Sequence, residues 1–209
     1  QWFDYHPSTN LVYSTNCILF DCFEMSIKKN IRNKQRYERS LLSDAHKARL
    51  SDNFLSQWMK FSKELSYQSI AIYYPFDNEA SPLEIMNYLH SKNKEVLLPV
   101  IENDSKTLSF AKYDIQSELL KNHFGIFEPK DKEFVDIEDI DIALIPCVAF
   151  NDKLFRLGMG GGFYDQTFSK KSSTILIGLA YSFQYENKSF QEKHDIKMDY
   201  MITQKGVLE

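Results

Sequence analysis

The residues from Arg156 to Asp165, RLGMGGGFYD, have the types and spacing of a phosphate-binding loop. Four of the seven glycines in the chain fall between positions 158 and 162, so their density meets a local need. A glycine run lets the backbone reach positive φ and lets several N–H groups point into one hollow. Arg156 can hold an anion through a bidentate guanidinium, and Asp165 offers a carboxylate suited to Mg²⁺. We therefore predict phosphate binding here.

Two familiar glycine motifs do not describe this loop. A Walker A loop ends in Gly-Lys-Ser/Thr, whereas Gly162 is followed by Phe163 and Tyr164. The dinucleotide fingerprint needs its third glycine where Phe163 stands. A glycine-rich turn without a binding function is the alternative interpretation, and the flanking Arg and Asp make it less favoured.

The predicted elements around the loop strengthen this interpretation. An apolar stretch at 141–150 predicts a buried strand before the loop, and the residues from Gly162 to Lys170 predict a helix that opens after it. Free N–H groups and the helix dipole at such a junction favour negative charge.

A pair of cations precedes the rest of the fold. The pattern of residues 26–42 predicts a helix, in which Lys28 and Arg32 lie four positions apart and point from the same side. Such a pair is usually a solvated surface, but two cations on one face can also reach phosphates across a cleft. The spacing alone leaves both interpretations open.

The remaining pattern predicts an α/β domain with a mainly parallel central sheet and helices on both faces, a Rossmann-like three-layer arrangement. The expected strands are 69–76, 95–101, 107–113, 141–150, 174–181 and 200–203. The expected helices are 43–65, a helix with Ser81 as N-cap and Glu84 closing a capping box, and one or two turns at 114–121. Buried positions are expected at Leu50, Phe54, Trp58, Phe61, Ile85, Met86 and Leu89.

Ligands of such sheets bind beyond the carboxyl ends of the strands. We therefore expect loop 77–80, loop 124–129, the glycine loop and the segment after Tyr181 to converge on one site.

Length and composition fit one domain, which we place at 25–209. The net charge of −4 and the lack of a run of 18 apolar residues lead us to expect no nucleic-acid or membrane partner. Residues 1–24 lack Met, Lys and Arg, so we expect them to be a non-native or disordered extension before a start near Met25. Three cysteines, with Cys147 in an apolar strand, fit a reducing cytoplasm, and we expect a monomer.

Five landmarks in order resemble the 5-formyltetrahydrofolate cyclo-ligase family, over about 26–203. They are RLGxGGGFYD at 156–165, the basic pair, the loop at Glu79, FGIxEP at 124–129 and His194-Asp195. The resemblance implies ATP-driven closure of 5-formyltetrahydrofolate to 5,10-methenyltetrahydrofolate, with release of ADP and phosphate and with Mg²⁺ as cofactor.

The resemblance also implies roles for individual residues. ATP-binding residues would be Lys28, Arg32, Arg156, Gly158, Gly160, Gly161, Gly162, Phe163 and Tyr164, with Arg156 and Lys28 acting in catalysis. Residues that bind the folate would be Tyr74, Glu79, Phe124 and Tyr164, and the metal ligands would be Asp165 and Asp195.

Three departures from the family pattern are modest. Met159 replaces a frequent aromatic, Phe163 a frequent Tyr and Gln166 a frequent Arg, and the last change removes a cation near the phosphates. Two other functions stay open: a non-catalytic nucleotide- or folate-binding protein on the same fold, and a sugar-phosphate isomerase that needs no ATP. The intact charged residues argue against the first.

Overall fold

The computed structural model describes residues 27–170 and 173–209, and among them the main sheet has eight strands in the order β12-β11-β10-β7-β1-β2-β3-β6. These strands are β1 Ser69–Ala71, β2 Glu95–Val100, β3 Ser109–Lys112, β6 Phe134–Val135, β7 Ile142–Pro146, β10 Ile175–Leu179, β11 Tyr200–Thr203 and β12 Gly206–Leu208. The central run from β11 to β2 is parallel, whereas β12, β3 and β6 add antiparallel edges. The expected mainly parallel sheet is confirmed.

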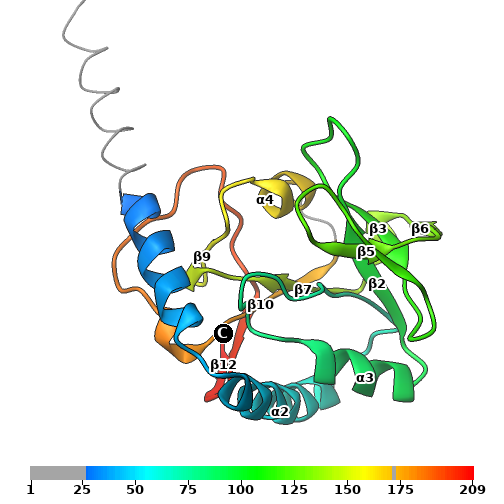
Figure 1. The fold of residues 1–209 in the computed structure, drawn as a ribbon, viewed down its shortest axis with the longest axis horizontal. Coiled ribbons are helices and arrows are strands. Elements are labelled where there is room, and N and C mark those ends of the chain that lie inside the picture. The colour runs from blue at the N-terminus through cyan, green and yellow to red at the C-terminus, as the bar shows by residue number, and fades with distance from the viewer. Residues whose placement is uncertain (1–26, 171–172) are drawn as a thin grey trace, which may run out of the picture.

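Helices and small hairpins cover the two faces of this sheet. The helices are residues 27–40, α2 Asp44–Phe61, α3 Leu83–Ser91 and α4 Phe163–Thr167, with 3-10 turns η1 Ser62–Glu64, η2 Ile137–Asp139 and η3 Ser182–Gln184. Two short hairpins pair β4 Leu119–Lys121 with β5 Phe127–Pro129, and β8 Ala149–Phe150 with β9 Arg156–Leu157. Helices α2 and α3 lie on one side of the sheet, and α4 and β9 lie on the other (Figure 1).

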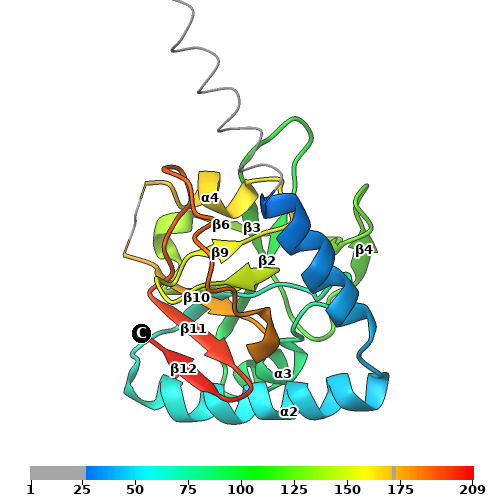
Figure 2. The same cartoon turned by 90° about the vertical axis from the view of Figure 1, so that its left-hand side faces the viewer.

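Helix 27–40 stands apart from these layers. It runs along the side of the molecule from near α4 toward α2, to which a loop connects it (Figure 2). No helix among the described residues combines the length and apolar character needed to cross a membrane.

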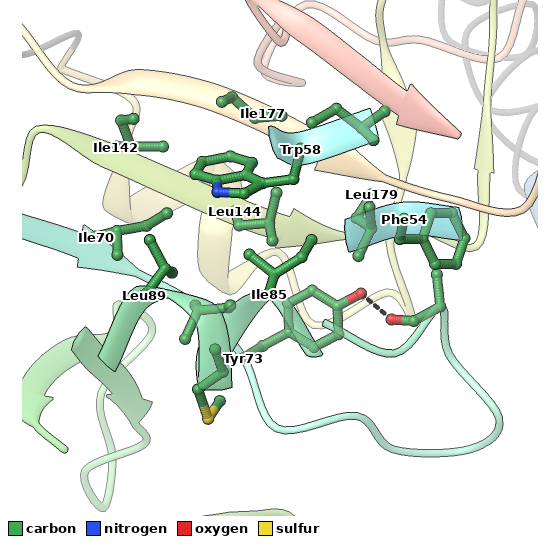
Figure 3. Close-up of a cluster of buried hydrophobic side chains, with 14 of the residues drawn as sticks. Phe54, Trp58, Ile70, Tyr73, Ile85, Leu89, Ile142, Leu144, Ile177 and Leu179 are labelled. Atoms are coloured by element: carbon green, nitrogen blue, oxygen red, sulfur yellow. Dashed lines mark hydrogen bonds between the residues drawn. The ribbon is translucent and has the colours of Figure 1, made fainter. Parts of the chain in front are cut away.

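The core is divided by the sheet because neighbouring side chains of a strand point to opposite faces. On the α2–α3 face, Trp58 and Ile85 pack with Leu144 (Figure 3). On the opposite face, Ala143 and Ile145 join a cluster that includes residues after the glycine loop. All the expected core positions are buried except Phe61, which is partly buried and packs against the cluster on the α2–α3 face.

Two expected strands end earlier than predicted, and the residues that follow each of them line the site. The strand expected at 69–76 covers only Ser69–Ala71. The strand expected at 141–150 is divided into β7 and β8, because the Val148 N–H donates to the Leu157 carbonyl and so leaves the main sheet.

Several local expectations were wrong. Residues 114–121 are not helical: Asp114 accepts from the Gln116 N–H in a turn, a common competitor of helix, and strand β4 follows. The capping box is absent, since α3 begins at Leu83 with Pro82 as its N-cap and no side-chain cap bond. Strands β6 and β12 were not anticipated, and the expected extension 1–24 lies outside the described residues.

The close pairing of β10 with β11 generates a stability prediction at Gly178, which lies opposite Met201. A Cβ at Gly178 would overlap the Met201 Sδ and approach the Cys147 Sγ to 3.0 Å. Gly178→Ala should therefore lower the free energy of unfolding by about 1–3 kcal/mol in a urea titration, the usual effect of overpacking.

A second variant separates this overlap from general damage. Met201→Ala removes the overlapping side chain. The double variant should therefore lose about 1 kcal/mol less free energy of unfolding than the sum of the losses in the two single variants. Strictly additive losses would contradict the overlap.

Candidate active site

A cavity of about 1020 Å³ lies beyond the carboxyl ends of β1, β2 and β7. Every predicted site residue lines it, namely Lys28, Arg32, Tyr74, Glu79, Phe124, Arg156, Gly158, Gly160, Gly161, Gly162, Phe163, Tyr164, Asp165 and Asp195. The segment after Tyr181 reaches the cavity through 192–195. The expected convergence of four loops is therefore confirmed.

The glycine loop leaves β9 and ends at α4 in a conformation that other residues adopt poorly. Gly160 has φ +111°, and Gly162, the N-cap of α4, has φ +69°. The Arg32 Nε donates to the Gly158 carbonyl at 2.9 Å, and the Arg32 guanidinium carbon lies 3.5 Å from where a Gly160 Cβ would stand. Because α4 has only five residues rather than the expected span to Lys170, the loop N–H groups matter more than a helix dipole.

Lys28 is buried, which decides against the solvated-surface interpretation for this residue. It is 8% exposed, and its Nζ lies 2.9 Å from an Asp195 oxygen and 3.0 Å from a Glu192 oxygen. Partial burial lowers the pKa of Arg32, while Asp195 and Glu192 oppose that shift. Helix 27–40 thus brings both predicted cations to the cavity.

Arg156 and Asp165 form an ion pair within the cavity wall. Arg156 is 3% exposed, and its Nη1 lies 3.3 Å from both Asp165 carboxylate oxygens. The Arg156 Nε is buried without a hydrogen-bond partner among the described residues. The guanidinium therefore keeps one N–H donor without a partner while its charge is partly neutralised.

The two predicted metal ligands both accept hydrogen bonds from backbone N–H groups of residues 192–196. Asp165 accepts from the Ile196 N–H at 3.2 Å, and Asp195 accepts from the Glu192 N–H at 2.8 Å. In the described part of the chain, no three His, Cys, Asp or Glu side chains gather as a metal site. Two carboxylates suit Mg²⁺ only where substrate phosphates and water complete its octahedral shell, as in many nucleotide sites.

Glu79 lines the cavity from a tight turn. Asp77 and Asn78 have left-handed φ values of 49° and 56°. The Glu79 Oε2 accepts from the Phe76 N–H at 3.0 Å, and the side chain is otherwise buried. Burial raises the pKa of Glu79 to about 7, although the Phe76 N–H bond and Arg39 act in the other direction.

Aromatic rings also line the cavity. Phe124 and Phe163 meet edge to face with centroids 6.2 Å apart, and Tyr74 packs against Phe127 at 4.9 Å. The Arg156 guanidinium carbon lies 5.7 Å from the centre of the Tyr164 ring. The cavity therefore combines anion-binding groups with aromatic rings and a buried carboxylate, which suit a flat ring that donates hydrogen bonds.

Asn122 and Glu192 line the cavity but were not identified from the sequence. The Asn122 Oδ1 accepts from the Phe124 N–H at 2.9 Å and the Ile126 N–H at 3.1 Å, which shapes the aromatic loop. Asn122 and Gly125 stand at the first and fourth positions of a β-turn, where Asn and Gly are common, and this signal could have identified Asn122. Glu192 shares Lys28 with Asp195, and only the fold brings it to Lys28.

Comparisons with known proteins give one consistent result. The family model described as the 5-formyltetrahydrofolate cyclo-ligase family matches residues 24–204. The 5-formyltetrahydrofolate cyclo-ligase of Haemophilus influenzae is 32% identical over 82% of this chain and 94% of that protein. The protein of the same name from Escherichia coli K12 is 30% identical over 83% and 98%.

A solved structure agrees with the sequence comparisons. The structure of 5,10-methenyltetrahydrofolate synthetase from Aquifex aeolicus superposes with a TM-score of 0.75 at 30% identity, covering 88% of this chain and 92% of that one. The corresponding synthetase from Mycoplasma pneumoniae, at 24% identity and a TM-score of 0.70, shares the fold.

The raised pKa of Glu79 predicts a pH-dependent cost to stability. Between its ordinary value of 4.5 and about 7, the folded protein keeps a proton that the unfolded chain has released. The contribution of Glu79 to the free energy of unfolding therefore falls as the pH rises through this window. The free energy of unfolding of Glu79→Gln minus that of wild type should be about 2 kcal/mol larger at pH 8 than at pH 5, measured by urea denaturation.

The matched control is Glu64→Gln, which removes an exposed carboxylate in η1. It should shift stability almost equally at the two pH values. An equal shift for Glu79→Gln would show that Glu79 is not desolvated.

Proposed function

The chain belongs to the 5-formyltetrahydrofolate cyclo-ligase family, and we propose that its cavity closes 5-formyltetrahydrofolate to 5,10-methenyltetrahydrofolate, driven by ATP. One observation carries this proposal: a single cavity joins a glycine loop flanked by cations to an aromatic wall that ends in a buried acid. This arrangement matches a reaction that needs a triphosphate and a reduced pterin side by side.

The nucleotide phosphates would bind at the glycine loop. Their oxygens would accept from the loop N–H groups and from Lys28, Arg32 and Arg156. Support comes from the burial of Lys28 and from the unpartnered Nε of Arg156, because a buried donor without a partner favours binding of an anion. Because Gln166 stands where the family often has an Arg, these three cations carry the charge.

The pterin would lie against the aromatic wall, with Glu79 accepting hydrogen bonds from ring N–H groups. Tyr74, Phe124 and Tyr164 would contact its faces. Stacking against aromatic rings and a bond to a charged acceptor are both strengthened where water is excluded. The buried side chain of Glu79 supplies that environment.

The chemistry then requires positioning more than a nucleophilic side chain. The formyl oxygen on N5 attacks the γ-phosphorus of ATP, ADP leaves, and the formyl group becomes a phosphate ester. N10 attacks the activated carbon, the N10 proton is released, and phosphate departs as the ring closes. Lys28 and Arg156 would stabilise the charge on the transferring phosphoryl group.

Mg²⁺ would be held by Asp165 and Asp195 together with the phosphates, and it would neutralise charge on the nucleotide. The ion pairs that these carboxylates make with Arg156 and Lys28 would fix their orientation before the nucleotide binds.

Three further features belong to the same proposal. We propose a monomer that acts in the cytoplasm on small molecules and without a nucleic-acid or membrane partner. The net charge of −4 supports the lack of a nucleic-acid partner, and the buried, reduced Cys147 supports a reducing compartment.

The direct test is to incubate the protein with Mg-ATP and 5-formyltetrahydrofolate and follow the near-ultraviolet band of the methenyl product. The band should grow only when ATP is present. Folded protein that binds ATP without forming the band would support a non-catalytic binding protein instead.

Arg156→Ala should lower turnover by roughly 10²-fold or more in this assay, the typical loss when a preorganised charge partner of a transition state is removed. The control is Lys153→Ala, which removes an exposed cation in the β8–β9 turn that does not line the cavity. Wild-type turnover in Arg156→Ala would show that this arginine has only a structural role.

A further inference from the structure

Helix 27–40 contacts residues around the cavity in two places. Its first turns bind the nucleotide side, where Lys28 pairs with Asp195 and Arg32 donates to the Gly158 carbonyl. Its last turns bind the turn that carries Glu79, since Arg36 and Arg39 both donate to the Asp77 Oδ2 at 2.7 Å. One helix therefore joins the two proposed substrate sites.

Arg39 makes the inner of these two bonds. Its side chain is 0% exposed, whereas that of Arg36 is 49% exposed. The Arg39 Nε and Nη1 have no hydrogen-bond partner among the described residues, and the amide of Gln35, one turn earlier, is buried in the same state. A buried guanidinium with a single bonded nitrogen is costly, so we expect it to be retained for its effect on its surroundings.

The partner of Arg39 is the residue that shapes the turn. Asp77 and Asn78 both have left-handed φ values, a conformation that costs about 1–3 kcal/mol where the residue is not glycine. The bond to Arg39 holds this conformation from the interior, and Glu79 follows immediately. The Glu79 carbonyl and the Ala80 carbonyl are fixed from the other side by the hydroxyls of Tyr181 and Tyr73.

Arg39 also interacts electrostatically with Glu79. The other titratable groups that interact with Glu79 are Asp77 beside it, Tyr73 after β1, Cys147 after β7, Tyr164 in α4 and Tyr181 after β10. Burial raises the pKa values of Tyr73, Tyr164, Tyr181 and Cys147, so these four stay neutral at neutral pH. Arg39 is the cation that opposes the effect of burial on the pKa of Glu79.

We propose that Arg39 is a positioning residue for the folate site, which holds the Asp77–Asn78 turn and places a buried positive charge near the Glu79 carboxylate that would accept hydrogen bonds from the pterin. This inference rests on the proposed function, because it assigns Glu79 to the folate. Arg39 acts through Glu79 and does not line the cavity itself. It gives helix 27–40 a second role, separate from the phosphate contacts of its first turns.

The test compares Arg39→Met with Arg36→Met, since both variants remove a bond of the same length to the same Asp77 oxygen. Arg39→Met should raise KM for 5-formyltetrahydrofolate about fivefold to tenfold at pH 7, with KM for ATP changed less than about twofold. The acid limb of the kcat/KM profile should move about one pH unit upward, because less Glu79 is ionised at each pH. Arg36→Met should leave both within about twofold, because solvent screens its charge.

Two further variants make the inference falsifiable. Arg39→Lys keeps the charge without the planar fork, so it should restore the pH profile while recovering only part of the affinity. In a Glu79→Gln background, Arg39→Met should add little further loss, since its route of action is already gone. A full additive loss in that background, or equal changes in KM for both substrates, would overturn the inference.

Failure of the proposed function can be distinguished from failure of this inference. If wild type shows no turnover, the function is wrong, but Arg39 can still be tested by stability. The stability difference that Glu79→Gln causes should change at a higher pH in the Arg39→Met background than in the wild-type background. An unchanged pH dependence would refute the link to Glu79. If Arg39→Met does not fold, Arg39→Lys and Asp77→Asn carry the same measurements: Asp77→Asn should raise KM for the folate alone, and an unchanged KM would count against the proposal.

Discussion

Charged side chains of helix 27–40 hold it against two segments beside the cavity. Lys28 and Arg32 fix it to residues 192–195 and to the glycine loop, and Arg39 fixes it to the turn before Glu79. Because one helix makes all these contacts, it sets the separation between the glycine loop and the turn that carries Glu79. An ATP-dependent ring closure needs that separation to be constant, since the formyl oxygen must lie in line with the γ-phosphorus.

The same contacts are expensive for the fold. Glu79, Lys28, Arg39 and Arg156 are all buried, and desolvation raises the pKa of Glu79 to about 7. A core of apolar residues at these positions would be at least as stable. Their presence is explained by function, because preorganised charges in a dry cavity stabilise a transition state without further reorganisation. The hydrophobic layers under α2 and α3 supply the stability that permits this.

The sequence was informative where local pattern and chemistry coincide. Leu50, Phe54 and Trp58 predicted the α2 face, and the glycine run predicted a ligand loop, which lies in the cavity wall. The break at Cys147 was not predictable, because it depends on a backbone bond between Val148 and Leu157 across the hairpin. Contacts such as Lys28 with Glu192 join residues far apart in sequence, and no local pattern encodes them. For the same reason Arg39 could not be singled out from the sequence, because only the fold brings it to Asp77.

Calorimetric titration of the folded protein with ATP, with and without Mg²⁺ and at two salt concentrations, tests the central claim most directly. The account predicts saturable binding of one nucleotide per chain that strengthens with Mg²⁺ and weakens with salt, since buried cations and two carboxylates hold the phosphates. A folded protein that releases no binding heat and protects no residue of the glycine loop from hydrogen exchange would contradict it.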